Sequence, residues 1–201
     1  MNFVFDLGGV LISYEPKKYV EKLLDNDTEM IYRLIFESPE WIELDRGTIS
    51  EDRAIEIWCK RKPEYSEYIR LVMKNWIEML VPVDENVLFL KFLKKKGHRL
   101  YVLSNFHKKA FEILYEKYDF FSLFDGLVIS YREKTVKPEE KIYRILLERF
   151  GLIPSETVFI DDSPKNIEAA QKIGLNTFLY RNHLELKKFL NKFLGGAIVE
   201  A

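Results

Sequence analysis

The sequence has 201 residues, 47% of them hydrophobic, which suffices for one compact domain or for a core with a smaller inserted piece. Its 31 Lys and Arg balance 32 Asp and Glu, so the net charge of −1 gives no electrostatic argument for binding nucleic acid or a membrane surface. The single cysteine, Cys59, excludes an internal disulfide. No secretory leader or bilayer-spanning apolar run is apparent, so we expect a cytoplasmic protein.

The first element is a short apolar run, Phe3 to Phe5, that ends on Asp6 and is soon followed by Gly8 and Gly9. Its aromatic and β-branched residues predict a buried strand with Asp6 at its carboxyl end, then a sharp turn. Open α/β sheets bind ligands at such strand ends. Asp6 is therefore a candidate nucleophile or metal ligand, although the pattern taken alone is more often an ordinary strand end.

From Lys17 to about Met79 the apolar residues recur at helical spacing, and no strand is predicted. Ser50 is typical of a helix N-cap, and Pro82 marks the end of this stretch. We therefore expect residues 15–81 to form an all-helical piece of four or five helices, inserted after the first strand.

From Asp84 onward the pattern alternates between helix and strand. Strands are predicted at residues 100–103, 127–130, 157–160 and 177–180, and helices at 87–96, 110–118, 139–150, from Ser163-Pro164 to about 174, and 184–194. Such alternation predicts parallel, right-handed βαβ units with helices on both faces of the sheet. The fold class is therefore α/β, with a core formed by residues 1–14 and 82–201 and a helical insert between its first two strands.

Four polar features follow strands or stand in loops of this core: Asp6, Ser104-Asn105, Lys137-Pro138 and Asp161-Asp162. If the first strand is central, all four can meet in one crevice. An ionised Asp6 needs no base to attack phosphorus, but its repulsion from a phosphate dianion must be offset. The set therefore favours phosphoryl transfer, with Asp6 and Lys137 as the catalytic residues.

A hard divalent cation held by oxygen ligands would offset that repulsion, and Mg²⁺ is the usual choice. We expect Asp6, Asp162 and the Gly8 carbonyl to bind it, with Asp161 as a further or water-bridged ligand. Adjacent carboxylates after a buried strand repel each other, and a cation relieves that repulsion.

Ser104 and Asn105 are expected to bind phosphate with nearby backbone N–H groups, and Lys137 to neutralise the developing charge. Each signal has a simpler interpretation. Ser104-Asn105 alone is most often a helix N-cap, and a lysine before Pro138 is most often a surface loop residue.

The segments FDLGGVL at 5–11, LSN at 103–105, KPEEKIY at 137–143 and FIDDSPKNIEAAQKIG at 159–174 resemble motifs of the haloacid dehalogenase superfamily. The resemblance is to phosphatase-like members with a helical cap. It implies a Rossmann-like core of about five parallel strands, a mobile cap, Mg²⁺ and an aspartyl-phosphate intermediate. By position, the nucleophile is Asp6, the phosphate-binding hydroxyl Ser104, the charge-balancing lysine Lys137, the metal pair Asp161 and Asp162, and a supporting polar residue Asn166.

The sequence departs from this family at Gly8, where its phosphatases usually carry a second Asp as general acid and base. Losing a positioned proton donor typically costs about 10²- to 10⁴-fold in rate. Glu15 and Asp45 are candidates to supply the missing group. A substrate with a good leaving group, such as an anomeric or acyl phosphate, would suffer least.

The cap is expected to select the substrate. Trp41 lies near Asp45 in a less regular stretch, where its ring could line a sugar or other small polar ligand or belong to the cap core. Residues 15–81 carry 11 Lys and Arg against 15 Asp and Glu, a net charge of −4 that argues against a polyanionic substrate. The expected substrate is a small phosphorylated metabolite, bound by a monomer or homodimer.

Two other functions fit part of the pattern. A metal-independent 2-haloacid dehalogenase could use Asp6, but the Asp161-Asp162 pair would then have no evident role. A catalytically weak relative that binds a phosphorylated ligand would explain Gly8. A phosphotransferase shares the first half-reaction with a phosphatase.

Overall fold

The computed structural model describes residues 1–194, and these residues contain one five-stranded parallel sheet in the order β3-β2-β1-β4-β5. Its strands are β1 (Asn2–Phe5), β2 (Arg99–Ser104), β3 (Gly126–Ile129), β4 (Thr157–Asp161) and β5 (Asn176–Leu179). The expected α/β fold is confirmed, and β1 is the central strand. Phe5 pairs with Val102 on one side and with Ile160 on the other, so β1, β2 and β4 end close together.

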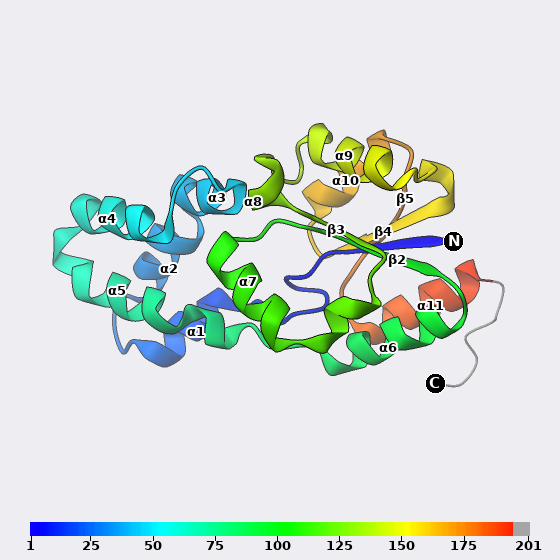
Figure 1. Ribbon diagram of the computed structural model, residues 1–201. Helices are drawn as coiled ribbons and strands as arrows, with labels where there is room; N and C mark the ends of the chain where they lie inside the picture. Colours follow the sequence, from blue (N-terminus) through cyan, green and yellow to red (C-terminus); the bar gives the residue numbers. More distant parts are fainter. Residues whose placement is uncertain (195–201) are drawn as a thin grey trace.

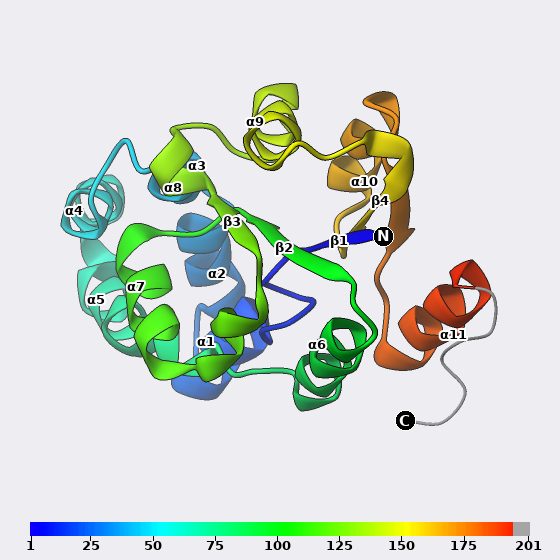
Figure 2. The same ribbon diagram turned by 45° about the vertical axis from the view of Figure 1, so that its right-hand side comes forward.

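Helices cover both faces of this sheet, as Figures 1 and 2 show. Val4 and Phe159 face α9 (Glu140–Phe150) and α10 (Pro164–Lys172), whereas Phe3 and Phe5 face the opposite side. That second face is covered by α6 (Asp84–Lys95), α7 (Lys108–Lys117) and α11 (His183–Phe193). Successive strand residues alternate between faces, so a strand covered on both sides reads as a continuous apolar run.

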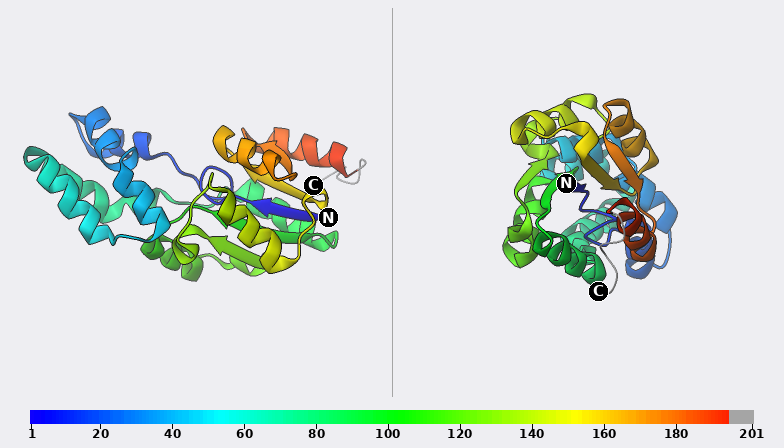
Figure 3. Two further views of the ribbon diagram at one scale, coloured as in Figure 1. Left: turned by 90° about the horizontal axis from the view of Figure 1, so that it is seen from above. Right: turned by 90° about the vertical axis from the view of Figure 1, so that its right-hand side faces the viewer.

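Residues 16–79 form a purely helical stretch between β1 and α6, here called the helical insert. It contains α1 (Pro16–Leu23), α2 (Thr28–Phe36), α3 (Pro39–Arg46), α4 (Glu51–Arg61), η1 (Pro63–Tyr65), α5 (Ser66–Asn75) and η2 (Trp76–Met79). The insert lies at one end of the molecule, beyond the carboxyl ends of the strands (Figure 3). It therefore faces the strand ends on which the sequence places its polar side chains.

Helix α3 is bounded by clear start and stop signals. The Ser38 hydroxyl accepts a hydrogen bond from Trp41 N at 3.2 Å, and Pro39 occupies the first helical turn. The helix ends at Gly47, whose φ of +71° suits glycine. These signals place Asp45 in the last turn of the helix, at the edge of the insert nearest the core.

Most predicted elements are present, with shifted ends. Helix α6 begins at Asp84 rather than at residue 87. Ser130 was expected in the third strand, but it begins the short helix α8 (Ser130–Glu133). The Ser130 hydroxyl accepts a hydrogen bond from Phe106 N at 2.9 Å and donates one to Asp45 O, which holds the chain out of the sheet. Within residues 1–194, no helix is long and apolar enough to cross a membrane.

Candidate active site

Asp6 lies directly after the central strand and is held by main-chain and side-chain donors. Its Oδ1 accepts hydrogen bonds from Leu7 N at 2.8 Å and from Ser104 Oγ at 2.6 Å, and Lys137 Nζ lies 2.8 Å away. Within residues 1–194, every hydrogen bond to this carboxylate goes to Oδ1. Oδ2 is therefore the oxygen left available to a ligand or to a reacting phosphorus.

Lys137 joins two carboxylates in the interior. Its side chain is 1% exposed, and Nζ lies 2.8 Å from Asp6 Oδ1 and 2.6 Å from Asp161 Oδ2. Burial alone would lower its pKa, but these two carboxylates outweigh burial and raise the pKa above its ordinary value. The lysine therefore stays charged, and its position is set by both partners.

Asp161 is fully buried at the end of β4, and other side chains engage both of its oxygens. Oδ1 accepts from Ser163 N at 2.8 Å, and Asn166 Nδ2 contacts Oδ1 at 3.0 Å and Oδ2 at 3.1 Å. Together with Lys137, these donors leave Asp161 better placed to orient the lysine than to face the cavity. Asn166, expected to be a supporting residue, contacts Asp161.

Asp162 is the more exposed member of the acidic pair, and its carboxylate lies against Gly9. Gly9 has a φ of +74°, and a Cβ there would lie 2.2 Å from Asp162 Oδ2. A side chain at residue 9 would therefore displace this carboxylate. The tight turn after Asp6 brings Asp162 beside the nucleophile position.

Asp6, Asp161 and Asp162 form an acidic cluster whose nearest ligand atoms all lie within 4.8 Å of one another. Burial raises the pKa of Asp6 to about 7; Lys137 opposes the shift, while Asp161 and Asp162 add to it. Burial and the charge of Asp161 likewise raise the pKa of Asp162. Lys137 pairs with two of these three carboxylates, Asp6 and Asp161, and the three carboxylates form a donor set that fits a hard divalent cation.

The remaining predicted phosphate-binding residue, Asn105, lies just past β2. Its side chain donates to Lys137 O at 3.0 Å and accepts from Lys137 N at 2.7 Å. This double hydrogen bond fixes the loop that carries the lysine. Ser104 donates to Asp6 in the same region, so the four polar features predicted from the sequence are brought together.

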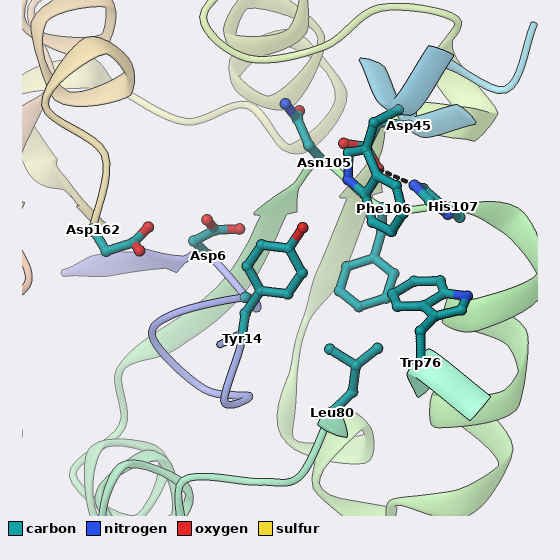
Figure 4. A pocket seen from close by; sticks show the side chains of 11 residues that line it. Asp6, Tyr14, Asp45, Trp76, Leu80, Asn105, Phe106, His107 and Asp162 are labelled. Atoms are coloured by element: carbon teal, nitrogen blue, oxygen red, sulfur yellow. Dashed lines mark ion pairs between the residues drawn. The ribbon is translucent and has the colours of Figure 1, made fainter. Parts of the chain in front are cut away.

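A cavity of about 290 Å³ opens over this cluster, between the strand ends and the helical insert (Figure 4). It is lined by Asp6, Gly8, Tyr14, Trp41, Asp45, Trp76, Leu80, Asn105, Phe106, His107 and Asp162. Half of its wall is thus aromatic or aliphatic, and its polar groups gather at two places. One is the strand-end cluster, and the other is formed by Asp45 and His107.

The three residues expected to contact the substrate or to supply the missing acid lie in different places. Trp41 and Asp45 both line the cavity, and Trp41 packs edge-on against Trp76 with the ring centroids 5.0 Å apart. Glu15 does not line it: this residue precedes α1, and its carboxylate pairs with Lys18 on the exposed side of that helix. The sequence placed Glu15 near the nucleophile because only a short loop separates the two residues, but the helix turns its side chain outward.

Five residues that line the cavity have no ligand role predicted from the sequence: Tyr14, Trp76, Leu80, Phe106 and His107. For His107 a signal was available, because it lies only two residues beyond the Ser104-Asn105 pair. The sequence indicates only a loop around Tyr14 and helical spacing around Trp76, and neither signal marks a side chain that faces a cavity. Their shared location depends on how the insert docks, which periodicity does not report.

The chain is 27% identical over 208 residues to D-ribitol-5-phosphate phosphatase from Bacteroides thetaiotaomicron, covering 96% of this chain and 98% of that protein. It is also 27% identical over 173 residues to the sesquiterpene phosphatase astK of Aspergillus oryzae, covering 86% and 85% of the two chains.

A solved structure gives the same picture. The haloacid dehalogenase family enzyme BT-2542 from Bacteroides thetaiotaomicron, crystallised with magnesium and inorganic phosphate, superposes with a TM-score of 0.69. The match has 26% sequence identity and covers 90% of this chain and 93% of that one. Residues 1–174 match the haloacid dehalogenase-like hydrolase family as a whole. The resemblance seen in the motifs is thus confirmed, and the chain belongs to the haloacid dehalogenase-like hydrolases.

Proposed function

We propose that the protein is a Mg²⁺-dependent phosphatase that hydrolyses a small phosphomonoester through an aspartyl-phosphate on Asp6. The observation that carries this proposal is the geometry of Asp6, whose Oδ1 is held by three donors, whereas Oδ2 has none among residues 1–194. A carboxylate fixed on one oxygen presents the other to phosphorus in a defined direction. The magnesium- and phosphate-bound structure of BT-2542 supports the same reaction class.

Asp6, Asp162 and the Gly8 carbonyl would hold the cation, and Asp161 would keep Lys137 in place. Mg²⁺ bound there would supply positive charge that offsets the charge of the phosphate and keeps Asp6 ionised. The acidic cluster supports this assignment, because its three carboxylates have ligand atoms within 4.8 Å of one another and Lys137 pairs with only two of them within residues 1–194. Lys137 and Ser104, both within 3 Å of Asp6, would contact the transferring phosphoryl group.

The helical insert would act as the cap, with residues 15–81 closing over a core of residues 1–14 and 82–201. Its contribution to the cavity favours a small leaving group, because about 290 Å³ is at the lower end for small-molecule sites. Trp41 and Trp76 offer aromatic faces to such a group. A sugar or polyol phosphate fits this volume, and the phosphatase of Bacteroides thetaiotaomicron named for D-ribitol 5-phosphate supports that substrate class.

Release of inorganic phosphate from an array of phosphorylated metabolites, with Mg²⁺ and with EDTA, tests the proposal. We expect turnover of at least one small phosphomonoester with Mg²⁺ and its loss with EDTA. Acid-quenched protein incubated with the labelled substrate should carry phosphate on Asp6. Halide release from a haloacid without metal, and no phosphate release, would overturn the proposal in favour of a dehalogenase.

A further inference from the structure

The cavity lacks a carboxyl group at Gly8, yet an alkoxide leaving group needs a proton. The other titratable side chains that line the cavity are Tyr14, Asp45 and His107, in addition to the acidic residues assigned to the nucleophile and the cation. Burial raises the pKa of Tyr14 well above its ordinary value, so its hydroxyl is a weak acid. Burial lowers the pKa of His107 to about 3, which leaves the imidazole neutral and without a proton to give.

Asp45 differs from both. Its side chain is 17% exposed, and burial raises its pKa well above the usual range for a carboxyl group. The charge of Asp6 adds to this shift, and Lys137 opposes it. Burial thus favours the protonated form of the Asp45 carboxyl, which is the form that can give a proton to a leaving group.

The main chain of Asp45 is fixed to the core although the residue belongs to the insert. Its carbonyl accepts a hydrogen bond from Ser130 Oγ, which also accepts one from Phe106 N. The next residue, Arg46, makes a two-pronged contact with Glu139 at 3.0 and 2.7 Å. The carboxyl of Asp45 thus enters the cavity from a rigid attachment, opposite the strand ends (Figure 4).

His107 is the neighbour of this carboxyl. Its Nε2 lies 3.2 Å from Asp45 Oδ1, and its ring packs against Trp41 and Trp76 with centroid distances of 4.3 and 5.1 Å. The side chain is 4% exposed, and neither ring nitrogen makes a well-aligned hydrogen bond to any residue in the range 1–194. A buried imidazole with free polar atoms beside a cavity carboxyl is costly unless the pair has a ligand to serve.

We propose that Asp45 is the proton donor to the leaving group, and that His107 is a positioning residue that orients the Asp45 carboxyl. The proposal rests on the proposed phosphatase function. Nε2 of the neutral His107 lies 3.2 Å from Oδ1 of Asp45 and would donate to that oxygen once substrate aligns the carboxyl, while Oδ2 would carry the proton toward the substrate. The position thus replaces, from the insert, the carboxyl that Gly8 cannot supply.

Hydrolysis would take place in two steps. Asp6 attacks phosphorus, the bond from phosphorus to the leaving oxygen breaks, and the proton of Asp45 passes to that oxygen to release an alcohol. Asp45, now a carboxylate, takes a proton from water as the water oxygen attacks the phosphorus of the aspartyl-phosphate. The bond from phosphorus to Asp6 breaks, inorganic phosphate leaves, and both side chains return to their first states.

Two aryl-containing substrates of similar size separate proton donation from binding. The p-nitrophenolate of p-nitrophenyl phosphate leaves without a proton, whereas the alkoxide of benzyl phosphate requires one. We expect Asp45→Asn to lower kcat/KM for benzyl phosphate by about 10²-fold and kcat/KM for p-nitrophenyl phosphate by less than about threefold, because kcat/KM reports the steps up to departure of the leaving group and not the later attack of water. Asp52→Asn, an exposed change in the same insert, should leave both values unchanged.

A second variant guards against a merely structural effect. A Cβ at Gly8 would meet nothing nearer than Tyr14 Cβ at 3.7 Å, so a side chain fits there. Adding Gly8→Asp to Asp45→Asn should raise kcat/KM for benzyl phosphate at least tenfold above its value in Asp45→Asn alone. Equal losses on both substrates, or no restoration by Gly8→Asp, would overturn the assignment of Asp45. If the wild-type enzyme releases no phosphate from any phosphomonoester of the array with Mg²⁺, the proposed function fails and this inference falls with it.

The positioning role of His107 has its own readout. With benzyl phosphate, kcat/KM should fall as the pH rises through the pKa of Asp45, which faces His107, Tyr14, Asp6 and Lys137. His107→Phe keeps the ring packing but removes the donor to the Asp45 carboxylate, so this fall should move to higher pH. An unchanged profile would show that His107 does not act through Asp45.

Discussion

The cavity has two walls that hold their polar side chains by different means. On the core wall, Asp6 accepts from Leu7 N and Ser104 and pairs with Lys137, each within 2.8 Å. On the insert wall, the Asp45 carboxyl has His107 as its polar neighbour, at 3.2 Å, and the surrounding surface is aromatic. The core wall is thus a set of charges fixed by strands, whereas the insert wall is an apolar surface with one carboxyl, Asp45, which meets His107 of the core.

This difference separates two tasks. Fixed charges at strand ends suit a reaction step that is the same for every phosphomonoester, because the phosphoryl group does not vary. An aromatic surface with one carboxyl suits recognition of the part that does vary, the leaving group. Changes on the core wall should therefore abolish turnover, and changes on the insert wall should alter it selectively.

The sharpest test of the core wall is Asp6→Asn. The amide cannot attack phosphorus, so phosphate release should fall by about 10⁴-fold or more on every substrate. Steady-state kinetics on several substrates measures the loss. Thermal unfolding serves as the control, because asparagine keeps an acceptor for Leu7 N and Ser104. Turnover within tenfold of wild type would contradict the nucleophile assignment.

The next largest effect is expected on stability, from Lys137→Met. Removing the ammonium leaves the carboxylates of Asp6 and Asp161 buried without their partner, which typically costs about 3–5 kcal/mol. Urea unfolding at neutral pH measures the free energy of unfolding. Lys141→Met, an exposed lysine on α9, should stay within about 0.5 kcal/mol of wild type. Added Mg²⁺ should reduce the difference in the free energy of unfolding between wild type and Lys137→Met. A loss of stability no larger than that of Lys141→Met would show that the two buried ion pairs of Lys137 do not stabilise the fold.

A third test uses two glycines with similar backbones and different surroundings. Gly9 and Gly97 have φ values of +74° and +81°, so alanine strains both by about 1 kcal/mol. A Cβ at Gly9 would strike Asp162, whereas a Cβ at Gly97 meets nothing within 4 Å. Gly9→Ala should therefore weaken Mg²⁺ affinity by about 10- to 100-fold, measured by titration calorimetry, and Gly97→Ala should not. Equal Mg²⁺ affinities of the two variants would show that Asp162 does not bind the cation.

The same two walls show what the sequence could predict. The fold and the strand-end residues were accessible because buried parallel strands are continuous apolar runs whose ends share one sheet edge. Asp6, Ser104 and Asp161 each follow such a run directly, so their meeting could be expected before any coordinates. Lys137 stands in a loop, and only the motif that contains it marked it out.

The insert wall was less accessible, for a physical reason. Helical periodicity identifies an apolar face but does not say whether that face packs on other helices or on a cavity. Trp76 lies in such a stripe and yet lines the cavity, and His107 carries no periodic signal at all. Glu15 shows the converse: it is near Asp6 in sequence, but α1 turns its carboxylate toward Lys18. Docking between distant segments decides these positions.

The smallest expected effect concerns the contact that holds the two walls together. Arg46 of the insert forms an ion pair with Glu139 of the core. The hydrogen bond from Arg46 is the main cause that lowers the pKa of Glu139 to about 2. Because the folded-state pKa is depressed, this contact stabilises the protein above the ordinary pKa of glutamate and loses its effect as the pH falls toward 2. The Glu139 side chain is 41% exposed, so solvent screening limits the gain to about 1 kcal/mol or less.

Arg46→Gln should therefore lower Tm slightly at pH 7, and the difference from wild type should shrink between about pH 4.5 and pH 2. Arg144→Gln is the matched control, since Arg144 pairs with Glu140 on one exposed helix and joins no separate parts of the fold. Protease cleavage within the insert should be faster in Arg46→Gln but not in Arg144→Gln, because only Arg46→Gln weakens the contact between the insert and the core. A Tm difference that stays constant across this pH range would assign Arg46 to packing rather than to charge. The attachment of the insert wall would then depend chiefly on the hydrogen bond from Ser130 to Asp45 O. The charge of Glu139 would have no part in positioning Asp45, the proposed proton donor.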